Sequence, residues 1–240
     1  TDALVFKSRS LYIKGKLNEA YQVMNLIEDT SDREVKFLQA DLLMEERRME
    51  EAEAIHQELA KSENESFDVL LDIVMNYLDA NQGNYAAKWL DILREKGYNE
   101  TNSQRFRDAW CDYCMAFGYP EKATEAFQLS VNELPYSLPH WNGMAKCYLA
   151  QNKLEQAHEA IDFALAIDEN NEEALEVKGF CHMQNENYEE AIAIFQRLLP
   201  EYPKSSRIYP PLVKCYLDLD KPEEAKEACL EWLKQCPQMS

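Results

Sequence analysis

Apolar and polar residues alternate along this chain with the period of a helix rather than that of a strand. Apolar positions recur three or four residues apart, as at Leu71, Val74, Met75 and Leu78. This spacing places side chains on one face of an α-helix. Short polar turns, such as residues 151–153, separate the apolar segments. The pattern therefore predicts an all-α chain built from pairs of helices.

The predicted helix pairs repeat along the chain. Ala123, Ala157, Ala191 and Ala225 are equally spaced, and each is followed four residues later by a larger side chain. The pattern of the pair at 138–171 recurs twice towards the C-terminus. It also recurs towards the N-terminus, where the match becomes progressively weaker. One helix pair cannot bury its apolar faces alone, so a fixed period of this length indicates stacked repeats.

The frame positions of the last three repeats carry a resemblance to a known family. They are Trp141, Met144, Ala145, Tyr148, Ala157 and Ile161; then Leu175, Lys178, Gly179, His182, Ala191, Phe195 and Pro203; then Tyr209, Leu212, Val213, Tyr216, Ala225, Cys229 and Pro237. Two helices in a period of about 34 residues on such a frame are typical of tetratricopeptide repeats, and the chain resembles the tetratricopeptide repeat family. The resemblance implies an all-α, right-handed solenoid of about seven helix-turn-helix repeats.

We expect one solenoid domain over residues 1–240. The expected repeats cover about 1–32, 33–66, 67–103, 104–137, 138–171, 172–205 and 206–240. The third repeat is the least regular, because no single register runs through its turn, and residues 97–103 form a longer loop than the period requires.

Composition and charge narrow the possible partners. The chain is 46% apolar, has no apolar run long enough to cross a membrane, and carries a formal net charge of −19. Nucleic acid and anionic membranes need a basic face, so we expect neither as a partner. The first residues contain no initiator Met and no apolar signal core. We therefore expect a fragment or processed product of a cytoplasmic protein. The alternative that a targeting signal has been removed stays open.

The cysteines do not form the pattern of a secreted disulfide framework, since there are seven. Cys147, Cys181 and Cys215 are spaced by one repeat period each and occupy one position in three successive repeats. Neighbouring helices lie about 8–10 Å apart, beyond the roughly 7 Å Cα separation that a disulfide tolerates. We interpret them as buried thiols in a reducing compartment. Cys111 and Cys114 form a C-x-x-C pair inside a predicted helix, which favours packing over redox chemistry or zinc.

No catalytic or cofactor motif is present. The chain has no Gly-rich phosphate loop, no G-x-S-x-G and no H-E-x-x-H, and its four histidines share no ligand spacing. We therefore expect a non-catalytic protein that carries no cofactor and no metal.

The resemblance implies that the first helix of each repeat lines a concave surface, which holds an extended peptide or a partner's helix. Residues spaced i, i+4, i+7 share one helix face, and these lines include Arg9, Tyr12, Phe37 and Asp41 in the first two repeats. The candidate partner-binding residues are Asp72, Asn76, Asp79, Asp108, Asp112, Met115, Asn142, Lys146, Leu149, Glu176, Phe180, Met183, Lys214 and Leu217.

The candidate face is acidic in its middle and apolar, beside two lysines, towards the C-terminus. A complementary partner segment would carry a basic stretch and apolar anchors. Family members that hold the C-terminal carboxylate of a chaperone use a basic and asparagine clamp. Asp108 and Asp112 stand on the corresponding lines here, so this use is disfavoured.

The leading functional interpretation is a protein-binding scaffold or adaptor. A second interpretation is a regulatory or targeting arm of a larger enzyme or sensor. A third is a structural oligomer that self-associates through the C-terminal end, around Cys229, Trp232 and Leu233.

Overall fold

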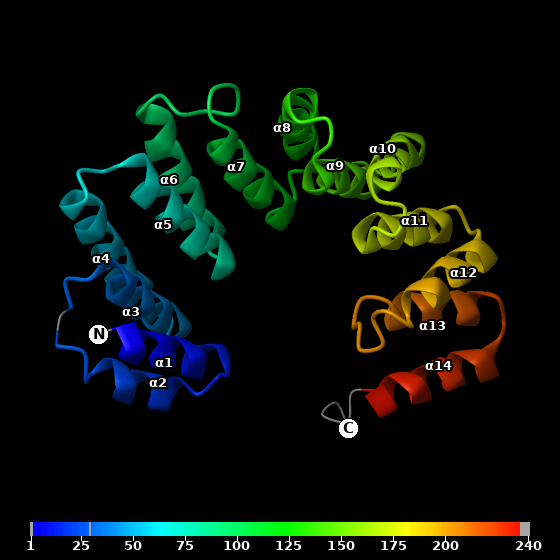
Figure 1. Ribbon diagram of the computed structural model, residues 1–240, viewed down its shortest axis with the longest axis horizontal. Helices are drawn as coiled ribbons and strands as arrows, with labels where there is room; N and C mark the ends of the chain where they lie inside the picture. Colours follow the sequence, from blue (N-terminus) through cyan, green and yellow to red (C-terminus); the bar gives the residue numbers. More distant parts are fainter. Residues whose placement is uncertain (1, 29, 236–240) are drawn as a thin grey trace. The chain divides into compact units, whose positions relative to one another are not determined.

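The computed structural model describes residues 2–28 and 30–235, and these residues form fourteen α-helices and no strand (Figure 1). The helices are α1 (Asp2–Ile13), α2 (Leu17–Met24), α3 (Arg33–Glu45), α4 (Met49–Ser62), α5 (Phe67–Asp79), α6 (Gly83–Glu95), α7 (Gln104–Ala116), α8 (Pro120–Glu133), α9 (Leu138–Ala150), α10 (Leu154–Ile167), α11 (Glu172–Gln184), α12 (Tyr188–Leu198), α13 (Tyr209–Asp218) and α14 (Pro222–Gln235). The all-α fold predicted from the apolar period is confirmed. Each expected repeat contains two helices.

The short turn between the two helices of a repeat uses one residue in the left-handed conformation. Gly118, Asn152, Glu186 and Asp220 have φ values of 80°, 56°, 60° and 56°, and they follow one another at intervals of one repeat period. The next residue closes the turn, as where the amide of Lys153 donates to the carbonyl of Tyr148 at 2.9 Å. A left-handed residue ends a helix because its amide and the next one satisfy the last carbonyl groups. The repeat is therefore visible in the backbone as well as in the side chains.

The chain divides into two compact units, residues 1–117 and 118–240. The expected fourth repeat contributes α7 to the first unit and α8 to the second. The organisation of residues 1–240 as a single solenoid domain stays a prediction.

In the first unit, successive helices pack in sequence order. The helices α1 and α2, α3 and α4, and α5 and α6 pair with each other, and α5 also contacts α7. The largest apolar cluster extends from α3 to α7 and includes Leu70, Tyr77, Leu90 and Phe106, none of which is exposed. The third repeat is thus well packed, although its sequence is the least regular.

The irregularity of the third repeat lies in the loop that follows it. Asn102 donates from its side chain to the carbonyl of Gly97 at 2.7 Å and accepts from the amide of Asn99 at 2.9 Å. Ser103 then caps α7 by accepting from the amide of Phe106. These bonds organise the extra residues that delay the next helix.

In the second unit, α9 pairs with α10, α11 with α12, and α13 with α14, while α8 packs on α9. Small residues occupy the close approaches predicted from the repeat frame. Ala145 and Ala157 are fully buried. At Gly179 an added Cβ would lie 2.6 Å from Cε1 of Phe195, so α11 and α12 approach too closely for any larger residue.

The cysteines that share one repeat position are buried. Cys147, Cys181 and Cys215 each have 0% exposure and are thiols rather than disulfide sulfurs. Burial raises the pKa of Cys147 to about 12 and the pKa values of Cys181 and Cys215 to about 11. The C-x-x-C pair is also buried inside α7, at 1% for Cys111 and 0% for Cys114. These positions agree with packing roles.

Candidate partner-binding faces on the first helices

The first unit has a surface pocket of about 370 Å³ on the first helices of its hairpins. Asp72, Asn76 and Asp79 of α5 line it, and these are three of the residues predicted from the helix face. The other lining residues belong mainly to α1 and α3: Arg9, Tyr12, Glu34, Phe37, Asp41, Met75 and Ala80. The i, i+4, i+7 lines of three successive first helices therefore meet at one place.

Negative charge accumulates around this pocket. Asn76 donates to Oδ1 of Asp41 at 2.5 Å, yet the pKa of Asp41 is raised by burial, with added repulsion from Asp79 and Glu45. The same causes, burial first and then the carboxylates of Asp41, Glu45 and Asp79, raise the pKa of Tyr12 to about 12.

The acidic character continues onto α7, where two more predicted residues lie. The pKa of Asp112 is raised by burial and by repulsion from Asp108 and Asp79. Asp79 thus interacts with acids of both α3 and α7, which makes one continuous acidic face. Arg33 neutralises part of the negative charge of this face through an ion pair with Asp72. Met115, the last predicted residue of α7, is partly buried.

In the second unit, the polar residues predicted on α9 contact the start of α11. The side-chain nitrogen of Asn142 donates to Oε2 of Glu173 at 2.8 Å and to Oδ1 of Asn171 at 3.0 Å. Lys146 forms an ion pair with the same Glu173. Burial tends to raise the pKa of Glu173, but the hydrogen bond and charge of Lys146 outweigh it and lower that pKa. Leu149, one turn further along α9, is partly buried.

The apolar residues predicted on α11 line a second pocket, of about 600 Å³. Phe180 and Met183 lie in it beside Lys214 of α13. The other lining residues are Gln184, Tyr188, Arg207, Pro210, Pro211 and Asp218. Glu176 lies one helical turn before Phe180 and is 9% exposed. Leu217 is 56% exposed and lies outside the lining of this pocket.

Several of these contacts were not foreseen from the sequence. Arg207, Tyr188 and Pro211 line the second pocket, although none of them lies on a predicted face. Arg207 precedes α13 and Tyr188 begins a second helix, so the i, i+4, i+7 rule for first helices could not select them. The proline pair 210–211 at the start of α13 was the one available signal.

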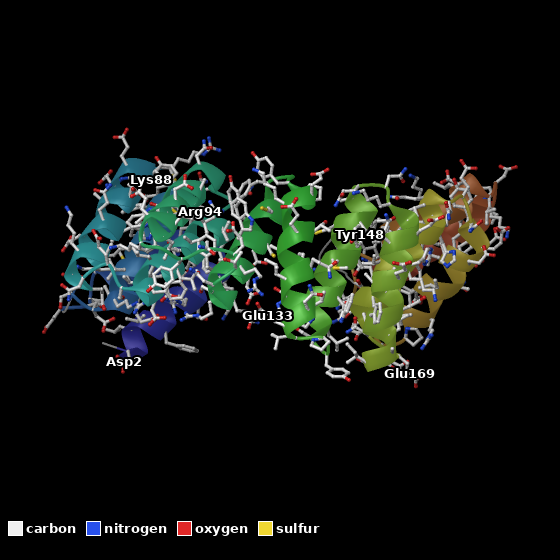
Figure 2. The ribbon with its side chains drawn as sticks, turned by 90° about the horizontal axis from the view of Figure 1, so that it is seen from above. Asp2, Lys88, Arg94, Glu133, Tyr148 and Glu169 are labelled. Carbon is white, nitrogen blue, oxygen red and sulfur yellow. The ribbon has the colours of Figure 1, made fainter. Side chains whose placement is uncertain are left out.

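A buried carboxylate on α4 was also missed. Glu53 is 8% exposed and accepts from the Tyr77 hydroxyl at 2.6 Å and from Nε1 of Trp89 at 3.1 Å. It also forms an ion pair with Lys88 of α6. Figure 2 labels Lys88 and Arg94, which belong to the same helix. Burial alone would raise the pKa of Glu53, but these donors outweigh burial and the pKa is lowered overall. The group joins α4, α5 and α6 and is fully occupied by structural contacts.

Among the described residues, no group of three or more His, Cys, Asp or Glu side chains is arranged to hold a metal ion. Over the same residues, every helix is too short or too polar to cross a membrane.

The C-terminal part of the sequence matches tetratricopeptide repeat profiles. Residues 142–206 and residues 182–238 each match a sequence profile described as tetratricopeptide repeat. A search of curated proteins finds no significant match to the sequence.

Solved structures extend the likeness over most of the chain. A tetratricopeptide repeat protein from Parabacteroides merdae is 19% identical, with a TM-score of 0.64, over 89% of this chain and 83% of that one. The thermophilic tetratricopeptide repeat protein TTC0263 of Thermus thermophilus is 15% identical, with a TM-score of 0.60, over 72% and 92%. The Pseudomonas aeruginosa protein pilF is 16% identical, with a TM-score of 0.53, over 86% and 94%.

The fold is therefore that of an α-solenoid, the class predicted from the repeat. The repeats over residues 142–238 match the tetratricopeptide repeat family directly, as the frame residues there indicated. Proteins of this family are generally protein-interaction scaffolds.

Proposed function

We propose that this chain is a non-catalytic scaffold that binds a segment of a partner protein on the faces formed by its first helices. The observation that carries the proposal is the position of the two pockets described above. One is lined by α1, α3 and α5, and the other mainly by α11 and α13. Pockets on regular helices whose side chains would otherwise be solvated favour a binding role for these faces.

The chemistry of the two faces defines a complementary partner. The acidic face of the first unit attracts Lys and Arg side chains, and the second unit offers Phe180 and Met183 to apolar anchors. Buried aromatic and aliphatic contacts contribute most of the affinity at such interfaces, whereas charge complementarity mainly accelerates association. The buried thiols support a reducing compartment, and we propose the cytoplasm.

Site-specific photo-crosslinking tests this proposal. A benzophenone side chain is placed at Met115 or Leu149 on the predicted faces and, as matched controls, at Glu125 or Glu159 on the second helices α8 and α10. In a lysate of the source cells, we expect crosslinks to a shared partner from the first helices only. Crosslinks that arise from the control positions alone would place the partner on the opposite side and contradict the proposal.

The same faces would serve a regulatory or targeting arm of a larger enzyme or sensor, which is the alternative from another functional class. The catalytic part would then lie in a separate region of the protein. Analysis of the full-length gene distinguishes this alternative from a free-standing adaptor.

A specific observation also favours self-association through α14. Leu230 and Leu233 are 49% and 47% exposed there, beside Trp232, which stacks on Tyr209 with ring centroids 5.6 Å apart. If this surface joins two copies, light scattering will show a dimer or larger species at micromolar concentration. Replacing both Leu230 and Leu233 by Glu should then restore the monomer, while a parent that is already monomeric excludes this mode.

A further inference from the structure

The second unit exposes large apolar side chains at an edge that lies outside both pockets described above. They are Leu134 (40% exposed), Tyr136 (85%), Phe163 (55%) and Ile167 (36%). Of the twelve large apolar residues that are exposed in the described part of the chain, four therefore fall in two short segments, 134–136 and 163–167. The first segment leads from α8 to α9, and the second contains the last turns of α10.

A chain of contacts joins the two segments. Phe163 stacks on Trp141 of α9, with ring centroids 4.4 Å apart and an angle of 14° between the rings. Nε1 of Trp141 donates to the carbonyl oxygen of Pro135, inside the first segment, at 2.8 Å. Glu133 precedes the first segment and Glu169 follows the second, and Figure 2 labels both towards the lower edge of the unit. The exposed side chains thus form one surface, the edge patch, which consists of Leu134, Tyr136, Phe163 and Ile167.

The next repeat carries polar residues at the same four positions. Nη2 of Arg197 donates to Oδ1 of Asn170 at 2.7 Å, and these residues lie one period after Phe163 and Tyr136. The corresponding positions are therefore neighbours in the geometry of the repeat. One period after the edge patch, the chain has the exposed residues Asp168, Asn170, Arg197 and Glu201.

Packing of the repeat does not require the edge patch to be apolar. Leu175 occupies the position of Trp141 one repeat later and is 5% exposed, although Arg197 there replaces Phe163. The frame residue is therefore buried equally well beside a polar residue. Apolar side chains gathered on a surface in this way are typical of an interaction site.

The charge around the edge patch is negative. Glu133, Asp162 and Asp168 are exposed and are direct sequence neighbours of patch residues. The helix pair α9 and α10, with its turn, contains two lysines and no arginine. Lys146 is held in the ion pair with α11, and Lys153 lies in the turn at the opposite end of the helix pair.

This combination of an apolar centre and acidic surroundings selects one kind of occupant. Burial of a partner's apolar side chains against the patch is favourable, and Lys or Arg residues beside them would face the acids. A second copy of this chain would instead bring the same acids together, which is unfavourable. An anionic membrane would be repelled for the same reason.

We propose that the edge patch is a second docking surface, which binds a segment of a separate protein that presents bulky apolar side chains flanked by Lys or Arg. The surface belongs to α8, α10 and the loop before α9. It therefore differs from the first-helix faces of the proposed function, and each surface can be occupied without the other.

The double variant Tyr136→Asn with Phe163→Arg gives the edge patch the residues of the next repeat. Because that repeat folds with Asn170 bonded to Arg197, the variant should keep its helical circular dichroism and a thermal unfolding midpoint close to that of the parent. A guanidinium at position 163 can also stack on Trp141. Loss of binding in this variant is then a loss of the surface and not of the fold.

Random twelve-residue peptides displayed on phage provide the probe. The library is first depleted on the double variant and then selected on the complete parent chain, and binding of the synthesised peptides is measured by fluorescence anisotropy. We expect peptides that combine Phe, Trp or Leu with at least two Lys or Arg residues. Their affinity should fall about tenfold or more in the double variant, because bulky apolar anchors contribute most of the affinity at such surfaces.

Two further variants separate the apolar and the charged contributions. Tyr202→Arg removes an exposed apolar side chain two repeats after Leu134 and changes the net charge by the same amount as the double variant, so it should leave peptide affinity unchanged. Asp162→Lys should slow association of the peptides and weaken its salt dependence.

Four results would overturn the inference. They are the absence of any peptide that distinguishes the parent from the double variant, and discriminating peptides that lack basic residues. A dimer of the parent that the double variant dissociates, measured by light scattering, would assign the patch to a second copy. Co-sedimentation of the parent, but not of the double variant, with phosphatidylcholine vesicles would assign it to a membrane. None of these variants lies on the first-helix faces, so the scaffold proposal is tested separately by its crosslinks.

Discussion

Gly179 shows how closely the repeat constrains a single position. A Cβ atom there would lie 2.6 Å from Cε1 of Phe195, a fully buried ring. In an isolated helix, Ala is more favourable than Gly by about 0.8–1 kcal/mol. The choice of Gly at this point of α11 is therefore made by packing against α12 and not by helix propensity.

Gly179→Ala should destabilise the second unit by about 1–3 kcal/mol, because the overpacking cost exceeds the propensity gain. Chemical denaturation measures the change. Phe195→Leu should cost stability alone but should reduce the penalty of Gly179→Ala when the two are combined, since it removes ring atoms near the new Cβ. Equal midpoints for the parent and Gly179→Ala would mean that α11 and α12 do not approach as described.

The buried thiols make a second prediction for single residues. Cys147, Cys181 and Cys215 are fully buried with raised pKa values of about 12, 11 and 11, so little reactive thiolate forms at pH 8. In the native state, alkylation followed by mass spectrometry should modify the half-buried Cys229 well before these three. Equal labelling rates for all four thiols would contradict the packing role.

At the scale of elements, the helix pairs could be predicted because their period and their turns are local. Residues 151–153 were expected to form a turn, and Asn152 adopts the left-handed conformation there. Asp72, Asn76 and Asp79 could be placed on one face of α5 for the same reason, and they line one pocket.

Contacts between elements could not be predicted in this way. In the sequence, Glu53 lies among other acids of α4, which is a pattern typical of a solvated helix face. Its burial depends on contacts with Tyr77 and Trp89 from the next hairpin. Asn142 and Lys146 were expected on an open face, but Glu173 of the next repeat occupies their donors. Helix periodicity predicts the face on which a residue lies. It does not predict which side chains of other repeats contact that residue.

The contact between α3, α4 and α5 makes the fold sensitive to acid. His56 of α4 is fully buried between Phe37 and Tyr77, with ring centroids 5.8 and 4.7 Å away. Burial lowers its pKa from 6.5 to about 4, against an opposing effect of Glu53. Above pH 6.5 the ring is neutral in both the folded and unfolded states. Between pH 6.5 and 4 only the unfolded state gains the proton, so stability is lost as the pH falls.

His56→Phe should therefore remove part of the acid sensitivity. The loss attributable to His56 amounts to about 3 kcal/mol between pH 6.5 and 4, at 1.36 kcal/mol per pKa unit. Urea denaturation at pH 7 and pH 5 should show about 2 kcal/mol of this loss, because the interval from pH 6.5 to 5 spans about 1.5 units. Taking the difference between parent and variant cancels the titration of the carboxylates. If the variant loses as much stability as the parent over this range, His56 is not buried as a neutral ring.

At the scale of the whole molecule, the sequence predicts one solenoid domain, whereas the contacts define two compact units. Each unit has its own apolar clusters, such as the one from α3 to α7 in the first and the one around Phe195 and Leu212 in the second. Repeat arrays derive stability from neighbouring repeats, and a weak interface allows them to unfold in steps.

Separate chains of residues 1–117 and 118–240 distinguish these descriptions. If the units are independent, each chain should give a cooperative thermal transition and helical circular dichroism, and the intact chain should show two transitions. Two unfolded halves, together with a single transition in the intact chain, would support one cooperative domain over 1–240.

Binding of the partner by the first helices of the repeats can be measured by hydrogen exchange followed by mass spectrometry, with and without the crosslinked partner in purified form. We expect slower exchange in α9, α11 and α13 of the second unit, and in α3, α5 and α7 where the partner reaches the acidic face, with α10 and α12 unchanged. Protection confined to α10, α12 or α14 would contradict it.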